Sequence, residues 1–397
     1  MQNLIKRSGC ILTCAVLAFS LFGGFIGGCK AKDGTESEQT LSFNNDMASS
    51  VVWPSVNADD LEKEMRMLGE SYRPLYEQAG KGSAHNVVLS EGSIQTIVEH
   101  FSAEGYTVTG AHRDMENYEP FEAFLEQASL GAEGQASYYY IHSDGGYARV
   151  DYYSKDRQLY MTAAALEWDD ALNAHVNDLG QYVIDQWQYT DKGYFIYERD
   201  VNMSRYALLR VRPLGEENRM LWNTYIRSIG YQGNNLFLTD WDQSSMDQIV
   251  FNDLYEYLYL IETGERTELG PTVERIPAEE FEPLFDKYFG VDPEFLRDNA
   301  LYYEDTNEYF WNYLMCGKHR ILFPAPEAEV VDNWRNEDGT ITLRVDVVDE
   351  HGGNERLFTH EVTIMVQENG SFRYISNRIL PQDEENVPDY TPRSEPF

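Results

Sequence analysis

The chain has 397 residues with 67 acidic against 31 basic side chains, a formal net charge of −36 at pH 7. A polyanion of this size repels nucleic acid, which argues against a nucleic-acid partner. Hydrophobic residues make up 42% and aromatic residues 14% of the chain, so the composition predicts a folded protein despite its acidity.

The first 28 residues have the layout of a secretory signal peptide: a short basic start, an apolar stretch and two glycines. The residues Ile26-Gly27-Gly28-Cys29 resemble the lipobox of bacterial lipoproteins. In that motif the cysteine thiol receives a diacylglycerol, and the preceding segment is cut away. An uncleaved transmembrane helix over residues 10–28 is the alternative. The small residues at the junction and the cysteine at the apolar-to-polar boundary favour the lipoprotein.

Processing at this point would make Cys29 the lipid-modified N-terminus. The protein would then be a membrane-anchored lipoprotein, exposed on the extracytoplasmic face of the cell membrane and held there by acyl chains such as palmitate. Cys10 and Cys14 would leave with the signal peptide, so Cys316 would have no partner for an intrachain disulfide. The mature chain would carry a net charge of −38, because only two basic residues are removed.

Residues 29–52 are polar and aperiodic, which predicts a flexible tether. Three helices are expected after it, because apolar residues recur with a period of 3.6. The first lies between Asp59 and Gly80, the second follows the capping residue Ser90 and ends at Gly105, and the third runs from about residue 115 to 131.

From about residue 137 the apolar period changes to two, and tyrosine becomes frequent. Turn residues such as Asp144-Gly145-Gly146 and Asp191-Lys192-Gly193 separate the runs, which predicts an antiparallel meander. Residues 137–270 hold too few strands for a β-propeller. We therefore expect helices packed on an antiparallel Tyr-rich sheet in a domain of residues 53–270, which ends near the turn-rich stretch ETGERTELGPT.

Residues 271–385 predict a second domain. Pro277 suits the first helical position, and an apolar face follows until Gly290 ends the helix. Alternating strands come next in TITLRVDVV and LFTHEVTIMV, and Asn369-Gly370 turns into a last strand. The overall fold class is thus α+β, with a cystatin-like or NTF2-like C-terminal domain as the fold-level analogy. Residues 386–397 are expected to form a polar tail.

The segments IPAEEFEPLFDKYFG, DGTITLRVDVV, FTHEVTI and FRYISNRIL, with MENYEPFEAFLEQA and YQGNNLFLTDWD upstream, resemble a family of uncharacterised lipoproteins from Gram-positive bacteria, a domain of unknown function. The resemblance covers most of the mature chain. It implies an extracytoplasmic location and no established catalytic residue.

Motifs for catalysis, metals and cofactors are absent from the sequence. The chain has no Gly-x-Ser-x-Gly, Ser-x-x-Lys, His-Glu-x-x-His or phosphate-binding loop. Asp240 and Asp242 begin like a calcium loop, but the later ligand positions fail. Cys316 and His319 are too few for structural zinc. We therefore predict no cofactor and no metal, and the sequence favours a protein without enzymatic activity.

Two groups of residues are candidate ligand sites. Tyr231, Asp240, Trp241 and Asp242 combine aromatic faces with carboxylates, a mixture that suits a glycan; alternatively Trp241 belongs to the core. His360 is the one polar side chain on an apolar strand face, and is either a pocket residue or a hydrogen-bonded core histidine.

Two functional hypotheses follow. The first is a binding or interaction module for an envelope glycan, peptide or protein, which the absence of nucleophile motifs favours. The alternative is an extracytoplasmic hydrolase that uses paired carboxylates, such as Asp169 and Asp170.

Overall fold

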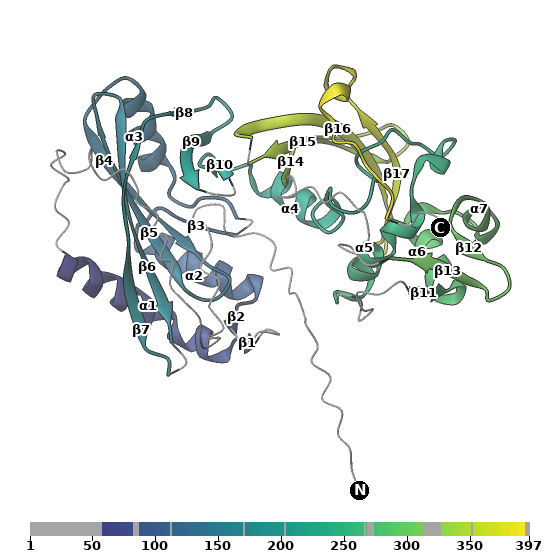
Figure 1. Ribbon diagram of the computed structural model, residues 1–397, viewed down its shortest axis with the longest axis horizontal. Helices are drawn as coiled ribbons and strands as arrows, with labels where there is room; N and C mark the ends of the chain where they lie inside the picture. The colour runs from purple at the N-terminus through teal and green to yellow at the C-terminus, as the bar shows by residue number, and fades with distance from the viewer. Residues whose placement is uncertain are drawn as a thin grey trace, which may run out of the picture. The chain divides into compact units, whose positions relative to one another are not determined.

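The computed structural model describes residues 58–81, 87–111, 113–169, 171–201, 204–265, 267, 274–312, 327–350 and 352–393. The predicted signal peptide, Cys29, the tether of residues 29–52 and Cys316 lie outside these ranges. The chain divides into two compact units, residues 1–213 and 214–397 (Figure 1). Each unit combines helices with mainly antiparallel sheets, so the predicted α+β class is confirmed.

The first unit contains the three predicted helices, α1 (Ala58–Gln78), α2 (Glu91–Ala103) and α3 (Glu119–Ser129). Ser90 caps α2 as expected, because its hydroxyl accepts a hydrogen bond from the Ser93 amide at 3.1 Å. Each helix buries one apolar face, and α3 buries Phe121, Phe124, Leu125 and Ala128.

A five-stranded sheet forms the centre of this unit in the order β3-β4-β5-β6-β7. Its strands are β3 (Val108–Gly110), β4 (Gly134–Ile141), β5 (Tyr147–Lys155), β6 (Gln158–Trp168) and β7 (Ala174–Ile184). Only the β3–β4 pair within it is parallel. A second sheet has the order β10-β9-β8, and a short pair joins β1 to β2. Their strands are β1 (Gly80–Lys81), β2 (Val87–Val88), β8 (Trp187–Tyr189), β9 (Tyr194–Val201) and β10 (Ser204–Arg210).

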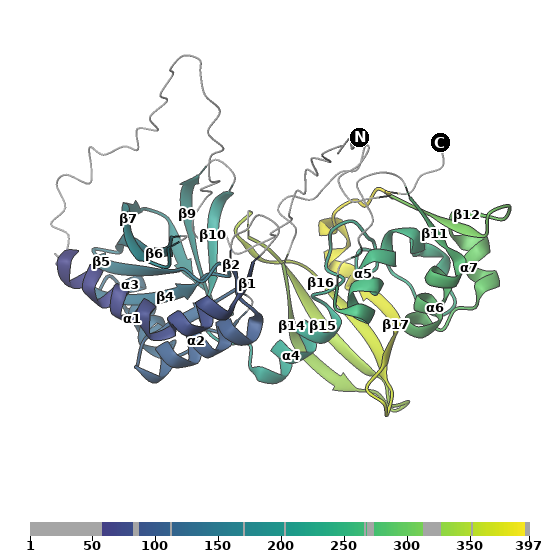
Figure 2. The same ribbon diagram turned by 90° about the horizontal axis from the view of Figure 1, so that it is seen from below.

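Both faces of the five-stranded sheet are covered. The helices α1 and α2 pack on one face (Figure 2). Tyr72, Phe101 and Tyr147 belong to one apolar cluster there. The helix α3 and the sheet β8–β10 pack on the other face, where Phe121, Tyr152 and Phe195 belong to a second cluster. The end of α3 and the turn between β8 and β9 are therefore brought to the same side of the unit.

The second unit has four α-helices among its described residues: α4 (Glu216–Tyr225), α5 (Phe251–Thr263), α6 (Ala278–Phe289) and α7 (Pro293–Asn299). Its main sheet is a regular antiparallel meander of β14 (Glu327–Arg335), β15 (Ile341–Asp349), β16 (Asn354–Val366) and β17 (Phe372–Ile379). A small sheet has the order β11-β13-β12, from β11 (Glu274–Pro277), β12 (Tyr302–Tyr303) and β13 (Glu308–Trp311). Two 3₁₀ turns are η2 (Met246–Gln248) and η3 (Pro381–Asn386).

The division between the units lies at residues 213 and 214, whereas the sequence predicted a boundary at 270. The reason is the core of the second unit. Trp222 of α4 and Leu254 of α5 are buried in the same cluster as Leu343 of β15 and Phe358 of β16. The apolar faces of α4 and α5 are therefore buried with the C-terminal sheet rather than with the Tyr-rich one.

The segment predicted as a polar tail is packed instead. Val387 and Tyr390 lie against the core cluster, and the Arg393 side chain is only 1% exposed. We call residues 387–393 the C-terminal strap. The Arg393 amide donates to a carboxylate oxygen of Asp253 at 2.8 Å, and its guanidinium donates to the Asp253 carbonyl oxygen at 2.6 Å. The strap is thus held to α5, a contact that its polar composition did not indicate.

Candidate functional site

The indole of Trp241 is a core group of the second unit. It is 2% exposed, its Nε1 donates to the Leu236 carbonyl oxygen at 2.8 Å, and its ring lies 5.8 Å from that of Phe289. The backbone of Trp241 also pairs with Asn377 of β17. The ring face that a sugar would need is therefore covered by protein.

The two neighbouring aspartates shape the loop around Trp241. Asp240 accepts a hydrogen bond from the Ile379 amide at 2.6 Å. Asp242 accepts from the Ser244 amide at 2.8 Å and from the hydroxyls of Ser244 and Ser245, and these bonds lower the pKa of Asp242. Both side chains therefore make bonds within the fold, although both residues are exposed.

Tyr231 and His360 meet inside the core. The Tyr231 hydroxyl lies 2.6 Å from His360 Nε2, and His360 Nδ1 lies 2.6 Å from Asn377 Oδ1. Because the Asn377 side-chain amide donates to Thr239 O, its Oδ1 accepts the Nδ1 proton, and Tyr231 donates to Nε2. Burial lowers the pKa of His360 to about 4. The imidazole is neutral and fully hydrogen-bonded, as the core-histidine alternative predicted.

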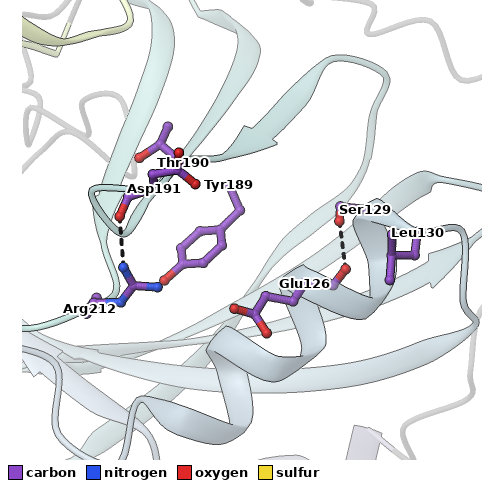
Figure 3. Close-up of a pocket in the computed structure, with 7 residues that line it drawn as sticks. All are labelled: Glu126, Ser129, Leu130, Tyr189, Thr190, Asp191 and Arg212. Carbon is purple, nitrogen blue, oxygen red and sulfur yellow. Dashed lines mark hydrogen bonds between the residues drawn. The ribbon is translucent and has the colours of Figure 1, made fainter.

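A pocket of about 340 Å³ opens in the first unit between the C-terminal end of α3 and the β8–β9 turn (Figure 3). Its lining combines apolar, aromatic, hydroxyl and charged side chains. They are Glu126, Ser129, Leu130, Tyr189, Thr190, Asp191 and Arg212. None of these seven residues carries a sequence motif that predicts a ligand site.

Local geometry places the two walls of the pocket. The chain leaves α3 through Gly131, whose φ of +90° is the left-handed conformation that glycine tolerates, and Leu130 is left 72% exposed. In the opposite wall, a Cβ on Gly193 would lie 2.3 Å from that of Arg212. Only glycine at residue 193 lets Arg212 lie against the turn.

Glu122 holds two side chains of the pocket, Arg212 and Tyr189, in place. Its Oε1 accepts from Arg212 Nε at 2.8 Å and from the Tyr189 hydroxyl at 2.6 Å, and it lies 2.6 Å from Arg212 Nη2. Arg212 Nη1 donates to the Asp191 carbonyl oxygen at 2.8 Å. The bond to Glu122 raises the pKa of Arg212, and burial raises the pKa of Tyr189. Arg212 is therefore charged, paired and held in one orientation.

The remaining carboxylates of the pocket belong to Glu126 and Asp191, and both residues are exposed. Figure 3 shows the Glu126 carboxylate turned toward Tyr189 and Arg212. The negative charge of Glu126 contributes to the raised pKa of each of these two groups, in agreement with that placement.

Neither metal ligation nor membrane spanning is seen in the described ranges. There, no group of three or more His, Cys, Asp or Glu side chains is arranged to hold a metal ion. The same ranges contain no helix with the length and apolar character needed to cross a bilayer. Asp169, one of the paired acids singled out in the sequence, accepts hydrogen bonds from its own loop and lies 2.8 Å from His175 Nε2; Asp170 lies outside the described residues.

Comparison with known protein families shows which family the chain resembles. The model of a family of unknown function, DUF6070, matches residues 58–393. No curated protein and no solved structure matches the chain. The cystatin-like or NTF2-like analogy therefore stays a prediction.

Proposed function

The chain belongs to the DUF6070 family of unknown function, and from that premise we propose that it is a lipid-anchored binding module. It is tethered through Cys29 to the extracytoplasmic face of the cell membrane. It recognises its ligand in the pocket between α3 and the β8–β9 turn.

The anchor is supported by the junction at Ile26 to Cys29, where an apolar stretch ends in small residues and a cysteine. Two acyl chains, at about 0.8 kcal/mol per buried CH₂, hold a protein stably where one chain would not. Twenty-eight residues, 30–57, separate Cys29 from the start of α1 at Ala58.

The proposal that the protein recognises a ligand rests on the pocket. Its lining offers an exposed apolar side chain, an aromatic ring and carboxylates around one opening. Glu122 holds both Arg212 and Tyr189 before any ligand arrives. Such preorganised walls reduce the conformational entropy that binding would otherwise cost.

The hydrolase alternative gains less support from the same geometry. A pair of catalytic carboxylates has to face the substrate, with one free to act as acid or nucleophile. Glu122 is engaged by Arg212 and Tyr189. The other two acids of the pocket, Glu126 and Asp191, are exposed, whereas a catalytic acid is typically desolvated. We therefore propose binding rather than hydrolysis.

The first prediction concerns the anchor. Cells that express the wild-type chain should incorporate labelled palmitate into it, whereas Cys29→Ala should incorporate none, because the thiol is the acceptor of the diacylglycerol. Label is measured after the protein is captured through an added C-terminal tag. Equal labelling of both chains would contradict the lipid anchor.

The second prediction concerns the pocket. We expect a bound ligand from a panel of chitotriose, lysine-containing peptides and acidic peptides to shift amide resonances of residues 129–130 and 189–191 in the chain from residue 30 onward. Leu130→Ser should weaken this binding about tenfold, with little loss of stability, because Leu130 is largely exposed.

Met67→Ser is the matched control, since Met67 is 64% exposed on α1 of the same unit. It should bind as the wild type does. The pocket would be rejected if all shifts lay elsewhere, if no member of the panel bound, or if Leu130→Ser bound like Met67→Ser.

A further inference from the structure

We propose that the pocket between α3 and the β8–β9 turn selects a primary ammonium group on an alkyl chain, as in a lysine side chain or a polyamine. This inference rests on the proposed function and names its ligand class. The ammonium would lie between the carboxylates of Glu126 and Asp191, and the alkyl chain would lie on Leu130 and the Tyr189 ring.

The charge of the pocket favours a cation. Arg212 is neutralised by Glu122, which its guanidinium contacts through both Nε and Nη2. The lining then has two further acidic side chains, Glu126 and Asp191, and no further basic one. An anionic ligand would meet these carboxylates without gaining a free guanidinium.

The hydrogen-bonding groups of the pocket also favour a cationic ligand, independently of net charge. Three side-chain donors of the lining are engaged within the protein. Arg212 Nη1 donates to Asp191 O, and the Tyr189 hydroxyl donates to Glu122. The Ser129 hydroxyl donates to the Glu126 carbonyl oxygen at 2.6 Å. The carboxylate oxygens of Glu126 and Asp191 add hydrogen-bond acceptors to the lining. An ammonium group is the complementary partner, because it has three donors and no acceptor.

The apolar part of the lining suits a short alkyl chain. Leu130 is 72% exposed beside the opening, so its side chain is available to the alkyl part of a ligand. The Tyr189 ring adds an aromatic face that attracts an ammonium group within about 6 Å. A cavity of about 340 Å³ accommodates a side chain or a small amine rather than a folded domain.

The charge of the whole chain supports capture of such a ligand. At −36, the protein generates a negative potential that concentrates cations at its surface and raises their association rate. The potential alone does not select this pocket, so the test has to separate local binding from general attraction.

The test uses three probes that differ only in the side chain: the Nα-acetyl amides of lysine, norleucine and glutamate. Each is titrated into the chain from residue 30 onward, and amide resonances of residues 129–130 and 189–191 are followed. We expect saturable shifts with the lysine probe and at least tenfold weaker binding of the other two. Affinity for lysine should fall as salt is raised.

Glu126→Gln and Asp191→Asn should each weaken the lysine probe about tenfold, because each removes one charge-assisted hydrogen bond. Glu104→Gln is the matched control, since Glu104 is an exposed acid at the end of α2 and outside the pocket. It should bind like the wild type. If all three variants lost the same affinity for the lysine probe, the probe would be attracted by the overall negative charge rather than by the pocket, and the inference would be overturned.

The remaining outcomes separate the two proposals. Tighter binding of the norleucine or glutamate probe at the same amides would overturn the ammonium inference and leave the pocket as a binding site. If no probe, peptide or saccharide shifted these amides, the proposed function would fail together with the inference.

Discussion

Replacing Arg393 with alanine is expected to destabilise the second unit by about 3–5 kcal/mol, because breaking a buried ion pair leaves its partner charged and uncompensated. Arg393 is 1% exposed, its Nη1 lies 2.5 Å from a carboxylate oxygen of Glu256, and Asp253 beside it is fully buried. The same Nη1 donates to Asn312 O at 3.1 Å, so the substitution also removes a link to the end of β13.

Arg378→Ala is the matched control in the same unit. The Arg378 side chain is 64% exposed and pairs with Glu361 at 2.8 Å. Solvent screens such a pair, and its loss should cost under about 1 kcal/mol. Denaturant unfolding of the two variants and the wild type measures the difference. Similar midpoints for both variants would show that the strap does not stabilise the unit.

Trp241→Ala is expected to cost about 3–5 kcal/mol, the range for emptying a large aromatic site in a packed core. The indole is 2% exposed, and its removal also leaves the Leu236 carbonyl oxygen without its donor. The resulting cavity adjoins Phe289 of α6, so residues 231–241 should pack less tightly against this helix.

Trp334→Ala on β14 provides the comparison, because Trp334 is only half-buried and has Arg344 over its ring. It should cost under about 2 kcal/mol. Chemical denaturation followed by circular dichroism gives both values. If Trp241→Ala lost no more stability than Trp334→Ala, the core position of Trp241 would be wrong, and its ring would again be a candidate for ligand stacking.

Elements with local signals were predicted from the sequence. The three helices of the first unit follow from apolar periodicity, and the Ser90 cap follows from a hydroxyl placed before an apolar run. The strands β15 and β16 follow from strict alternation in TITLRVDVV and LFTHEVTIMV. Asn369-Gly370 marks the turn before β17. In each case, residues within one element determine its conformation.

The partners of residues that pair over long distances along the chain were not predicted. The pocket joins Glu122 to Arg212 across 90 positions, and His360 finds Tyr231 across 129. The burial of Trp241 depends on β17, which follows it by more than 130 residues. The strap has a polar sequence, but its Arg393 faces Asp253 and Glu256 of α5 inside the protein rather than solvent. No short stretch of the sequence indicates such pairings, because the two partners lie far apart along the chain.

The bond between Asp253 and Arg393 spans 140 residues, and this separation has a consequence during synthesis. At about 5–20 residues per second, the ribosome needs on the order of 10 s to advance from α5 to the strap. Over that interval Leu254 and Leu258, which are fully buried in the finished protein, lack most of the strands that cover them. The first unit closes by residue 213, so it can fold while the second waits. We therefore expect chains truncated between residues 264 and 340 and lacking the signal peptide to contain a compact N-terminal unit followed by an exposed apolar segment.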